Sequence, residues 1–246
     1  MPELIEVEAY RQLAELALER KITEVVAPDA WWLKGGLSAE VLSDALVGRH
    51  FLAARRIGKR MMLDTSDHGP VLGLKFGMTG RLLVDGLVGV EKLQYSSNRD
   101  VPAWNRLMVV FADGGDLRVR DPRRLGGAEL DPEEGRLGPD AVGLNLAGLR
   151  TVLGASRMAL KARLMDQSKI AGLGNLLVDE ALFQAGLDPA RPAGGLDDVE
   201  LKRLHQALRK TLTNLTKRGG SHTGVLQPAR RREGLCPLDG APLLRR

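Results

Sequence analysis

The sequence has little cysteine, no long apolar run and no large excess of charge of either sign. Cys236 is the only cysteine in 246 residues, which excludes an internal disulfide framework and favours a reducing compartment. No apolar run approaches membrane-spanning length, and the first residues are acidic where a signal peptide is basic. We therefore expect no membrane partner and a cytoplasmic location.

The balance of residue types indicates a folded protein. Hydrophobic residues make up 43% and charged residues 27% of the chain, which argues against extensive disorder, and the length suffices for two modest domains. The 36 Lys and Arg exceed the 31 Asp and Glu, and the net charge of +5 suits a polyanionic partner without requiring one. The arginines at 230–232 and 245–246 are either a solvated tail, the more frequent case, or phosphate contacts.

The first half of the chain combines one helical pattern with many strand patterns. Apolar residues recur at helical spacing over residues 7–17, which predicts an amphipathic first helix. Residues 22–130 are rich in strand patterns, including two runs within 107–119 that flank an Asp-Gly-Gly turn. We predict a sheet-based domain over residues 1–130, followed by a Pro- and Gly-rich linker over residues 131–148.

The second half is typical of helices. One helix is predicted over residues 149–165, and leucines from 201 to 215 mark another, which Asp197 or Asp198 would cap and Gly219-Gly220 would end. The remaining regions are a helical domain, residues 149–220, and a C-terminal region without periodicity, residues 221–246.

Pro2 and Glu3 carry the first pattern with chemical potential. Loss of Met1 would leave Pro2 with a free secondary amine, whose reference pKa of about 7.7–8.0 leaves a neutral fraction able to attack an electrophilic carbon. Such an amine can form a cationic iminium with a sugar carbon, and Glu3 could protonate the opening sugar ring. Proline is common here and the helix dipole favours a glutamate, so these residues alone fit an ordinary helix start better.

A glycine-containing turn at residues 167–180 carries the second pattern. Gly172 and Gly174 would allow a ligand close to the backbone, the amides at the start of the following helix would form an anion site, and Asn175 could donate to the same phosphate. Taken alone, the Gly-x-Gly spacing fits an ordinary helix–helix corner.

Taken together, the motifs resemble the formamidopyrimidine-DNA glycosylase and endonuclease VIII family. The segments that carry the resemblance, spread from the first residue to about Ser221, are Pro2–Glu8, Gly58-Lys59-Arg60, Phe76-Gly77-Met78-Thr79-Gly80, Asp121-Pro122-Arg123-Arg124-Leu125-Gly126 and Gln167–Glu180. The resemblance implies an α+β multidomain fold: a β-sandwich-like N-terminal domain with a leading helix, then a helix-two-turn-helix domain with a C-terminal zinc-finger-like or degenerate zincless hairpin.

The resemblance also implies roles for single residues. Pro2 would be the nucleophile, Glu3 the general acid and Lys59 a phosphate-binding lysine near the reacting nucleotide. Met78, Arg123 and Leu125 match side chains that fill the gap left by the flipped nucleotide or face its partner base. Lys169, Gly172, Gly174 and Asn175 would contact DNA in the helix-two-turn-helix segment. Without the motifs, Met78 and Leu125 would pass for core residues and Lys59 for a surface lysine.

Several positions depart from the family pattern. Ile5 replaces a proline that only presets the backbone angle, and Lys75 replaces a histidine with a fixed charge. Leu125 replaces an aromatic that stacks on the base opposite the lesion, so a π-face is lost there. The connection between residues 221 and 236 leaves little room for a loop over an oxidised purine, and His222 within it is more often a solvated side chain than a lesion contact.

The C-terminal region departs most, because the family usually folds a four-cysteine zinc finger there. Cys236 and Asp239 remain only as remnants of a possible zinc site, so a closed site with four cysteine ligands is impossible. Either further residues belong to the chain or the hairpin is metal-free. We expect no cofactor and leave zinc open.

These observations predict a monomeric base-excision-repair DNA glycosylase with abasic-site lyase activity, acting on double-stranded DNA with damaged bases or abasic sites, in the bacterial cytoplasm or nucleoid. The alternative is a catalytically reduced protein that binds lesions or structured DNA on the same scaffold. A ribosomal or topoisomerase-like nucleic-acid module would not explain Pro2-Glu3 or Gly58-Lys59-Arg60.

Overall fold

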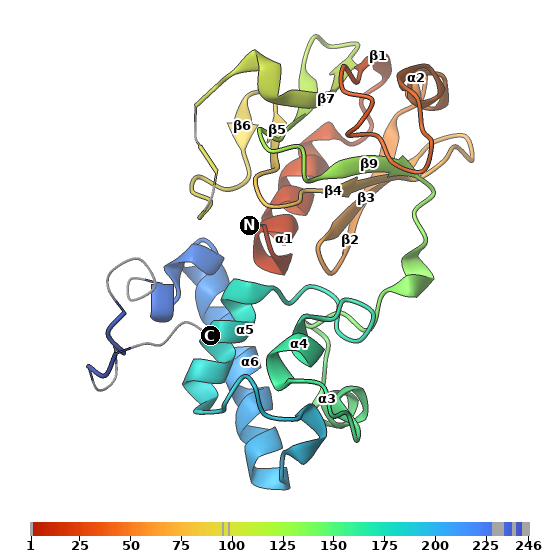
Figure 1. Ribbon diagram of the computed structural model, residues 1–246. Coiled ribbons are helices and arrows are strands. Elements are labelled where there is room, and N and C mark those ends of the chain that lie inside the picture. Colours follow the sequence, from red (N-terminus) through yellow and green to blue (C-terminus); the bar gives the residue numbers. More distant parts are fainter. Residues whose placement is uncertain (1, 95, 98, 228–233, 238–239, 243–246) are drawn as a thin grey trace. The chain divides into compact units, whose positions relative to one another are not determined.

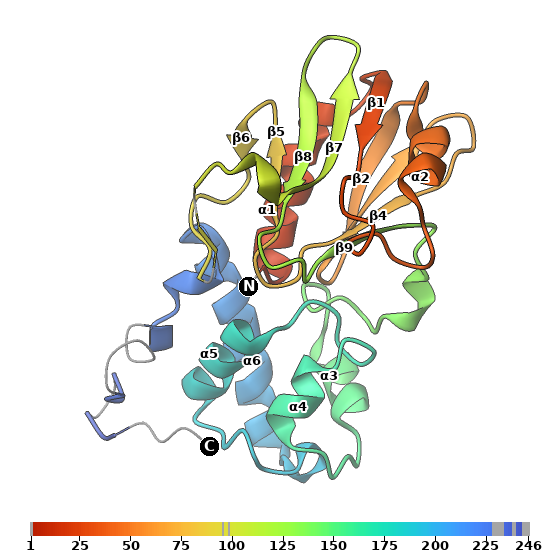
Figure 2. The ribbon, with the colours of Figure 1, turned by 45° about the horizontal axis from the view of Figure 1, so that its top comes forward.

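The computed structural model describes residues 2–94, 96–97, 99–227, 234–237 and 240–242 (Figures 1 and 2). The chain folds into two compact units, Met1–Gly135 and Arg136–Arg246. Sheets occupy the first unit and α-helices dominate the second, which confirms the predicted mixed fold class. Within the described part of the chain, every helix is too short or too polar to span a bilayer.

Two antiparallel sheets form the first unit. The five-stranded sheet has the order β1-β7-β8-β5-β6, and its strands are Ile22–Val26, Asn105–Phe111, Asp116–Arg120, Arg81–Val84 and Leu87–Val88. The four-stranded sheet has the order β2-β3-β4-β9, and its strands are Phe51–Ile57, Arg60–Thr65, Leu72–Lys75 and Gly127–Leu130. Apolar side chains of both sheets share one core, as in a β-sandwich.

Helix α1 (Leu4–Ala14) leads the unit and continues into a 3-10 turn, η1 (Glu15–Ala17), as the helical spacing predicts. Val7, Tyr10 and Ala14 are fully buried, and the helix packs against β2, β3 and β5. Because these strands belong to both sheets, α1 joins the two layers at the end of the chain that carries Pro2.

The predicted hairpin around residue 114 is confirmed. Leu107, Val109 and Phe111 alternate into the core along β7, and β8 pairs with β7 in antiparallel register. The turn places Gly114 at φ +87, a conformation that favours glycine. A second 3-10 turn, η2 (Pro102–Trp104), precedes β7.

One helix inside the strand-rich region was not predicted. Helix α2 spans Ala39–Leu46, and the hydroxyl of Ser38 accepts a hydrogen bond from the Val41 amide at 3.2 Å. Leu42 and Leu46, four residues apart, are fully buried. The serine cap and this spacing are helix signals, but the segment is short and lies among strand patterns.

The second unit contains the helices α3 (Leu146–Leu153), α4 (Leu160–Met165), α5 (Asn175–Ala185) and α6 (Asp198–Lys217), with the 3-10 turns η4 (Ala193–Gly195) and η5 (Ser221–Thr223). Another 3-10 turn, η3, spans Glu134–Arg136. Asp197, one of the two predicted caps, is the N-cap of α6, and it also shares a capping box with Glu200.

The single helix predicted over residues 149–165 is wrong. Helix α3 ends at Gly154, which has φ +51 and ψ −145, and α4 begins only at Leu160. Ala159 instead forms a bridge with Pro192. The apolar spacing continues across the break, so periodicity alone could not reveal it.

Candidate nucleic-acid interface and active site

The N-terminal segment holds its reactive side chains in a buried setting. Pro2, Glu3 and Glu6 are all buried. Glu3 is the N-cap of α1, and its side chain accepts from the Glu6 amide while the Glu6 carboxylate accepts from the Glu3 amide at 2.8 Å. This reciprocal capping box fixes both carboxylates beside Pro2.

Lys59 lies in the turn between β2 and β3. Gly58 has φ +58 there, and Arg56 donates both to the Gly58 carbonyl at 2.9 Å and to Glu8 of α1 at 3.0 Å. Partial burial lowers the pKa of the Lys59 ammonium below the ordinary lysine value, and the negative charges of Glu3 and Glu6 oppose that shift. The first unit therefore brings Lys59 into electrostatic range of Glu3.

Asp121 links the loop of Met78 to the loop of Arg123. Its fully buried carboxylate accepts from the Thr79 hydroxyl at 2.5 Å, from the Gly126 amide at 2.7 Å and from the Trp32 indole at 3.3 Å. Sequence reasoning assigned no role to Asp121 or Trp32. An aspartate followed directly by proline at a strand end is the signal that could have drawn attention to Asp121.

The backbones of the same two loops touch. Gly77 has φ +54, and a Cβ atom there would clash with the backbone of Leu125. Met78 is half-buried, Arg123 is exposed and Leu125 is 50% exposed. The loops of residues 76–80 and 121–126 therefore form one braced platform. It carries Met78 and Arg123, predicted to fill the gap left by a flipped base, and Leu125, predicted to face the opposite base. Leu125 is not a core residue.

Arg124 links this platform to the segment between β1 and α2. It has φ +58 and donates to both carboxylate oxygens of Asp29, at 2.6 and 2.7 Å. Arg106 adds an ion pair to Asp29 at 3.3 Å. The hydrogen-bonded guanidinium of Arg124 lowers the pKa of Asp29.

In the second unit, Gln167 organises the turn between α4 and α5. Its side-chain amide donates to the carbonyls of Met165 at 2.7 Å and Leu173 at 2.8 Å, and its oxygen accepts from the Gly172 amide at 3.0 Å. Gly172 has φ +107, which favours glycine, and Gly174 is the N-cap of α5.

The predicted phosphate contacts lie around this turn. Asn175 is half-buried at the first position of α5, where the helix dipole favours an anion, and Lys169 is exposed. Gly172 and Gly174 are buried. The second unit thus combines a helix N-terminus with one exposed cation in the same turn.

Two family models match the chain. The formamidopyrimidine-DNA glycosylase N-terminal domain matches residues 1–128, and the H2TH domain of the same enzyme matches residues 137–226. A formamidopyrimidine-DNA glycosylase of Cereibacter sphaeroides is 36% identical over 236 residues, with 90% of this chain and 80% of the relative covered. The chain belongs to the formamidopyrimidine-DNA glycosylase family.

Other members of the formamidopyrimidine-DNA glycosylase family support this placement. An Arabidopsis thaliana enzyme of that name is 31% identical over 225 residues, and the alignment covers 86% of this chain but only 57% of the plant protein. The structure of the Lactococcus lactis protein in complex with abasic-site DNA matches with a TM-score of 0.79 at 25% identity, covering 98% of this chain and 93% of that one. A complex of the L. lactis protein with FAPY-dG DNA gives the same TM-score and identity.

The C-terminal region of this family member does not fit the four-cysteine zinc finger that the resemblance implies. Cys236 is partly exposed, its amide donates to the Ala241 carbonyl at 2.7 Å, and Leu235 bridges Pro242. Asp239 lies outside the described residues. Among those that are described, no group of three or more His, Cys, Asp or Glu side chains could hold a metal ion.

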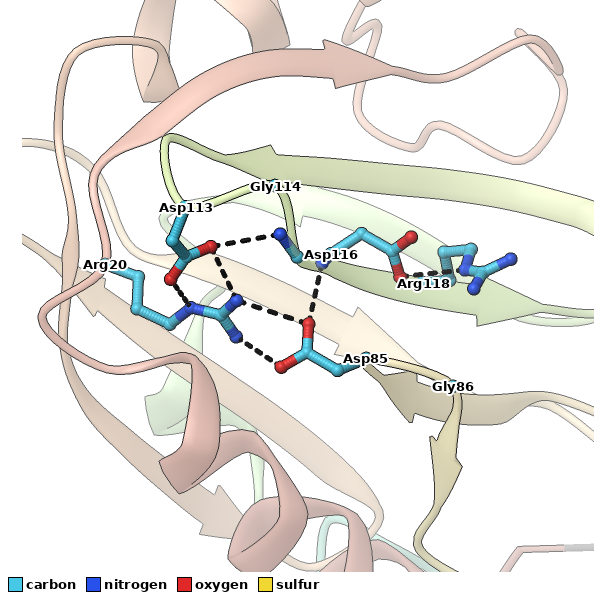
Figure 3. Close-up of a pocket in the computed structure, with 8 residues that line it drawn as sticks. Arg20, Asp85, Gly86, Asp113, Gly114, Asp116 and Arg118 are labelled. Atoms are coloured by element: carbon cyan, nitrogen blue, oxygen red, sulfur yellow. Dashed lines mark hydrogen bonds and ion pairs between the residues drawn. The ribbon is translucent and has the colours of Figure 1, made fainter.

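A pocket on the first unit belongs to a structural network (Figure 3). Arg20 donates to Asp113 at 2.7 Å and to Asp85 at 2.8 Å, and it lies 4.4 Å from the centre of the Phe111 ring. The hydrogen bond from Arg20 lowers the pKa of Asp113 to about 2. Its two arginines pair with its three aspartates, and no predicted site residue lines it. The network therefore joins two hairpin turns and carries no predicted chemistry.

Proposed function

We propose that this family member removes a damaged base from DNA and cuts the strand at the resulting abasic site, with Pro2 as the nucleophile. The observation that supports this most directly is the arrangement around α1: Glu3 and Glu6 are locked in a capping box beside Pro2, and Lys59 lies in their electrostatic range. The single cysteine suits the cytoplasm as the compartment.

The proposed reaction begins after loss of Met1, which frees the Pro2 amine. The amine attacks C1′ of the flipped nucleotide, the bond from C1′ to the base breaks, and the base leaves with a proton. Glu3 protonates the sugar ring oxygen as the ring opens, so an iminium links Pro2 to C1′. Loss of a C2′ proton to a base then expels the 3′ phosphate, which cuts the strand. Water hydrolyses the bond between C1′ and Pro2, which releases the sugar fragment and restores the amine.

The remaining assignments position the substrate. Lys59 would hold the phosphate beside the reacting nucleotide, and Asn175 with Lys169 would hold another at the start of α5. Met78 and Arg123 would fill the gap left in the base stack, and Leu125 would face the base opposite the lesion. Gly172 and Gly174 would let the DNA backbone approach the turn closely.

Borohydride trapping on DNA with an abasic site tests the nucleophile. Reduction converts the iminium into a stable amine, so the wild-type protein should form a covalent adduct with the oligonucleotide. Pro2→Gly keeps a free amino end but loses the secondary amine and should trap at least about tenfold less. Intact mass of the unmodified protein shows whether Met1 is absent.

The outcome separates the two candidate functions. If the wild-type protein has lost Met1 and binds abasic DNA yet forms no adduct, the proposed lyase activity is wrong. The alternative, a catalytically reduced protein that binds lesions, would then be favoured. Glu3→Gln should still bind but should excise a damaged base from duplex DNA far more slowly. If its excision rate equals that of the wild type, Glu3 is not the general acid.

A further inference from the structure

The first unit displays an exposed aromatic side chain that has no role in the proposed reaction. Trp31 is 70% exposed, and it is the only aromatic among the large hydrophobic side chains that are exposed in the described part of the chain. Its neighbour Trp32 is fully buried. An exposed indole on a well-braced segment is typical of a contact surface, because aromatic side chains lose little conformational entropy when they bind.

Trp31 lies on a segment that is fastened to the platform of Leu125. Both backbone groups of Ala128 bond to this segment. The Lys34 amide donates to the Ala128 carbonyl at 2.8 Å, and the Ala128 amide donates to the Trp32 carbonyl at 3.3 Å. The ion pair between Asp29 and Arg124 and the hydrogen bond from Trp32 to Asp121 add two side-chain links. Trp31 and Leu125 are therefore held by one rigid structure.

Lys34 fills the surface between Trp31 and that platform. A Cβ atom on Gly127 would lie 2.7 Å from both Cγ and Cε of Lys34, so the lysine stem runs across the Gly127 backbone. Its ammonium donates to the Trp31 carbonyl at 2.8 Å and lies 5.4 Å from the centre of the indole ring. The exposed indole of Trp31 and the ammonium of Lys34 thus lie on one segment, which is bonded to Ala128 and to the loop that carries the exposed Leu125.

We propose that Trp31 and Lys34 form an additional DNA contact on the strand opposite the damaged nucleotide. The indole packs against a deoxyribose and the edge of its base, and the Lys34 ammonium holds the adjoining phosphate. The proposal rests on the proposed function, in which Leu125 faces the opposite base, and it extends that contact with an aromatic surface that Leu125 itself lacks.

Binding to three forms of one oligonucleotide tests this contact. The lesion strand carries a tetrahydrofuran abasic analogue and is used in a full duplex, in a duplex with a gap opposite the analogue, and single-stranded. Trp31→Ala should weaken binding to the full duplex by about tenfold or more, as loss of an aromatic contact does. Its binding to the gapped duplex and the single strand should match that of the wild type.

Leu87→Ala provides the matched control, because Leu87 is 57% exposed on β6 and lies outside this surface. Thermal unfolding of both variants should match the wild type. Equal duplex affinity of Trp31→Ala and Leu87→Ala would overturn the contact. A loss of affinity for the single strand as large as that for the duplex would overturn the assignment to the opposite strand.

Lys34→Gln tests the phosphate contact separately. It should reduce the slope of log affinity against log salt concentration by about 1, because one phosphate contact is lost. An unchanged slope would remove Lys34 from the contact.

Borohydride trapping on single-stranded abasic DNA distinguishes the failure of this contact from the failure of the proposed function. Trp31→Ala should trap like the wild type, whereas failure of the wild type to trap counts against the proposed function.

Discussion

At the scale of single residues, the braced platform depends on one buried carboxylate. Asp121 is fully buried and accepts three hydrogen bonds, which come from the loop of Met78, from its own loop and from Trp32. A buried carboxylate is tolerated only when its oxygens are satisfied in this way. Asp121 is therefore a positioning residue for side chains that it does not itself touch.

Asp121→Asn should weaken this platform, although the asparagine side chain has nearly the same shape as that of aspartate. The new side-chain NH2 would face donors, so at least one buried donor loses its acceptor, at a cost of about 1–3 kcal/mol in the free energy of unfolding. The urea midpoint should fall with the slope unchanged. Excision from duplex DNA should fall more than trapping on single-stranded abasic DNA.

Thr79→Ser keeps the hydroxyl that donates to Asp121 and serves as the matched control, with unfolding and excision close to the wild type. If Asp121→Asn lowers the duplex and single-strand reactions equally, Asp121 acts through overall stability and not through the loops.

Sequence reasoning named residues that are predicted to face the substrate but not those that hold them in place. Met78, Arg123 and Leu125 were identified from short motifs that lie far apart in the chain. Trp32 and Asp29 belong to a segment without any motif, and their partners lie 89 and 95 residues away. Only the folded chain shows such long-range pairs.

At the scale of structural elements, the turn between α4 and α5 depends on the side chain of Gln167. Three of its hydrogen bonds close a loop whose glycine at 172 has φ +107. A side chain that hydrogen-bonds to nearby backbone groups in this way can fix a turn that lacks the backbone hydrogen bonds of a helix or a sheet. The backbone geometry at the start of α5, where we propose that a phosphate binds, is thus set by a residue eight positions before Asn175.

Gln167→Ala should loosen the turn. Loss of these hydrogen bonds should lower the free energy of unfolding by about 2 kcal/mol and weaken binding to duplex DNA. Thermal unfolding and fluorescence anisotropy measure the two effects.

Asp197→Ala is a suitable comparison, because loss of the α6 cap costs about 1 kcal/mol of stability without altering the turn. DNA affinity that falls as much in Asp197→Ala as in Gln167→Ala would show that the turn has no role of its own.

Elements were predicted best where a pattern was long and its ends were marked. Helix α6 has regular leucines, an aspartate cap and a Gly-Gly end, and all three were read correctly. Helices α3 and α4 were merged, because Gly154 interrupts the backbone without interrupting the apolar spacing. A single glycine is compatible with a helix or with its end, and packing decides between them.

At the scale of the whole molecule, the proposed chemistry relies on Pro2 and Glu3 and gives no role to a metal ion. The chain has one cysteine, and the described residues contain no cluster of metal-binding side chains. Prolonged dialysis against EDTA should therefore leave unchanged both trapping on abasic DNA and the melting temperature, because the proposed chemistry is carried by Pro2 and Glu3 and the buried residues are mainly apolar.

Elemental analysis of the same sample supplies the complementary measurement, with zinc expected at well under one atom per chain. Activity that is lost on dialysis and restored by zinc would contradict this expectation and would assign a metal to the region around Cys236.

The braced platform also has a consequence for how this protein can diverge. Gly77 has no room for a side chain, and replacing Asp121 would leave buried donors without an acceptor, so the backbone beneath positions 78, 123 and 125 tolerates little change. The side chains at those positions extend from this backbone into partly or fully open space. A lineage can exchange them one at a time without redesigning the fold, and leucine at position 125 is what such an exchange would leave behind.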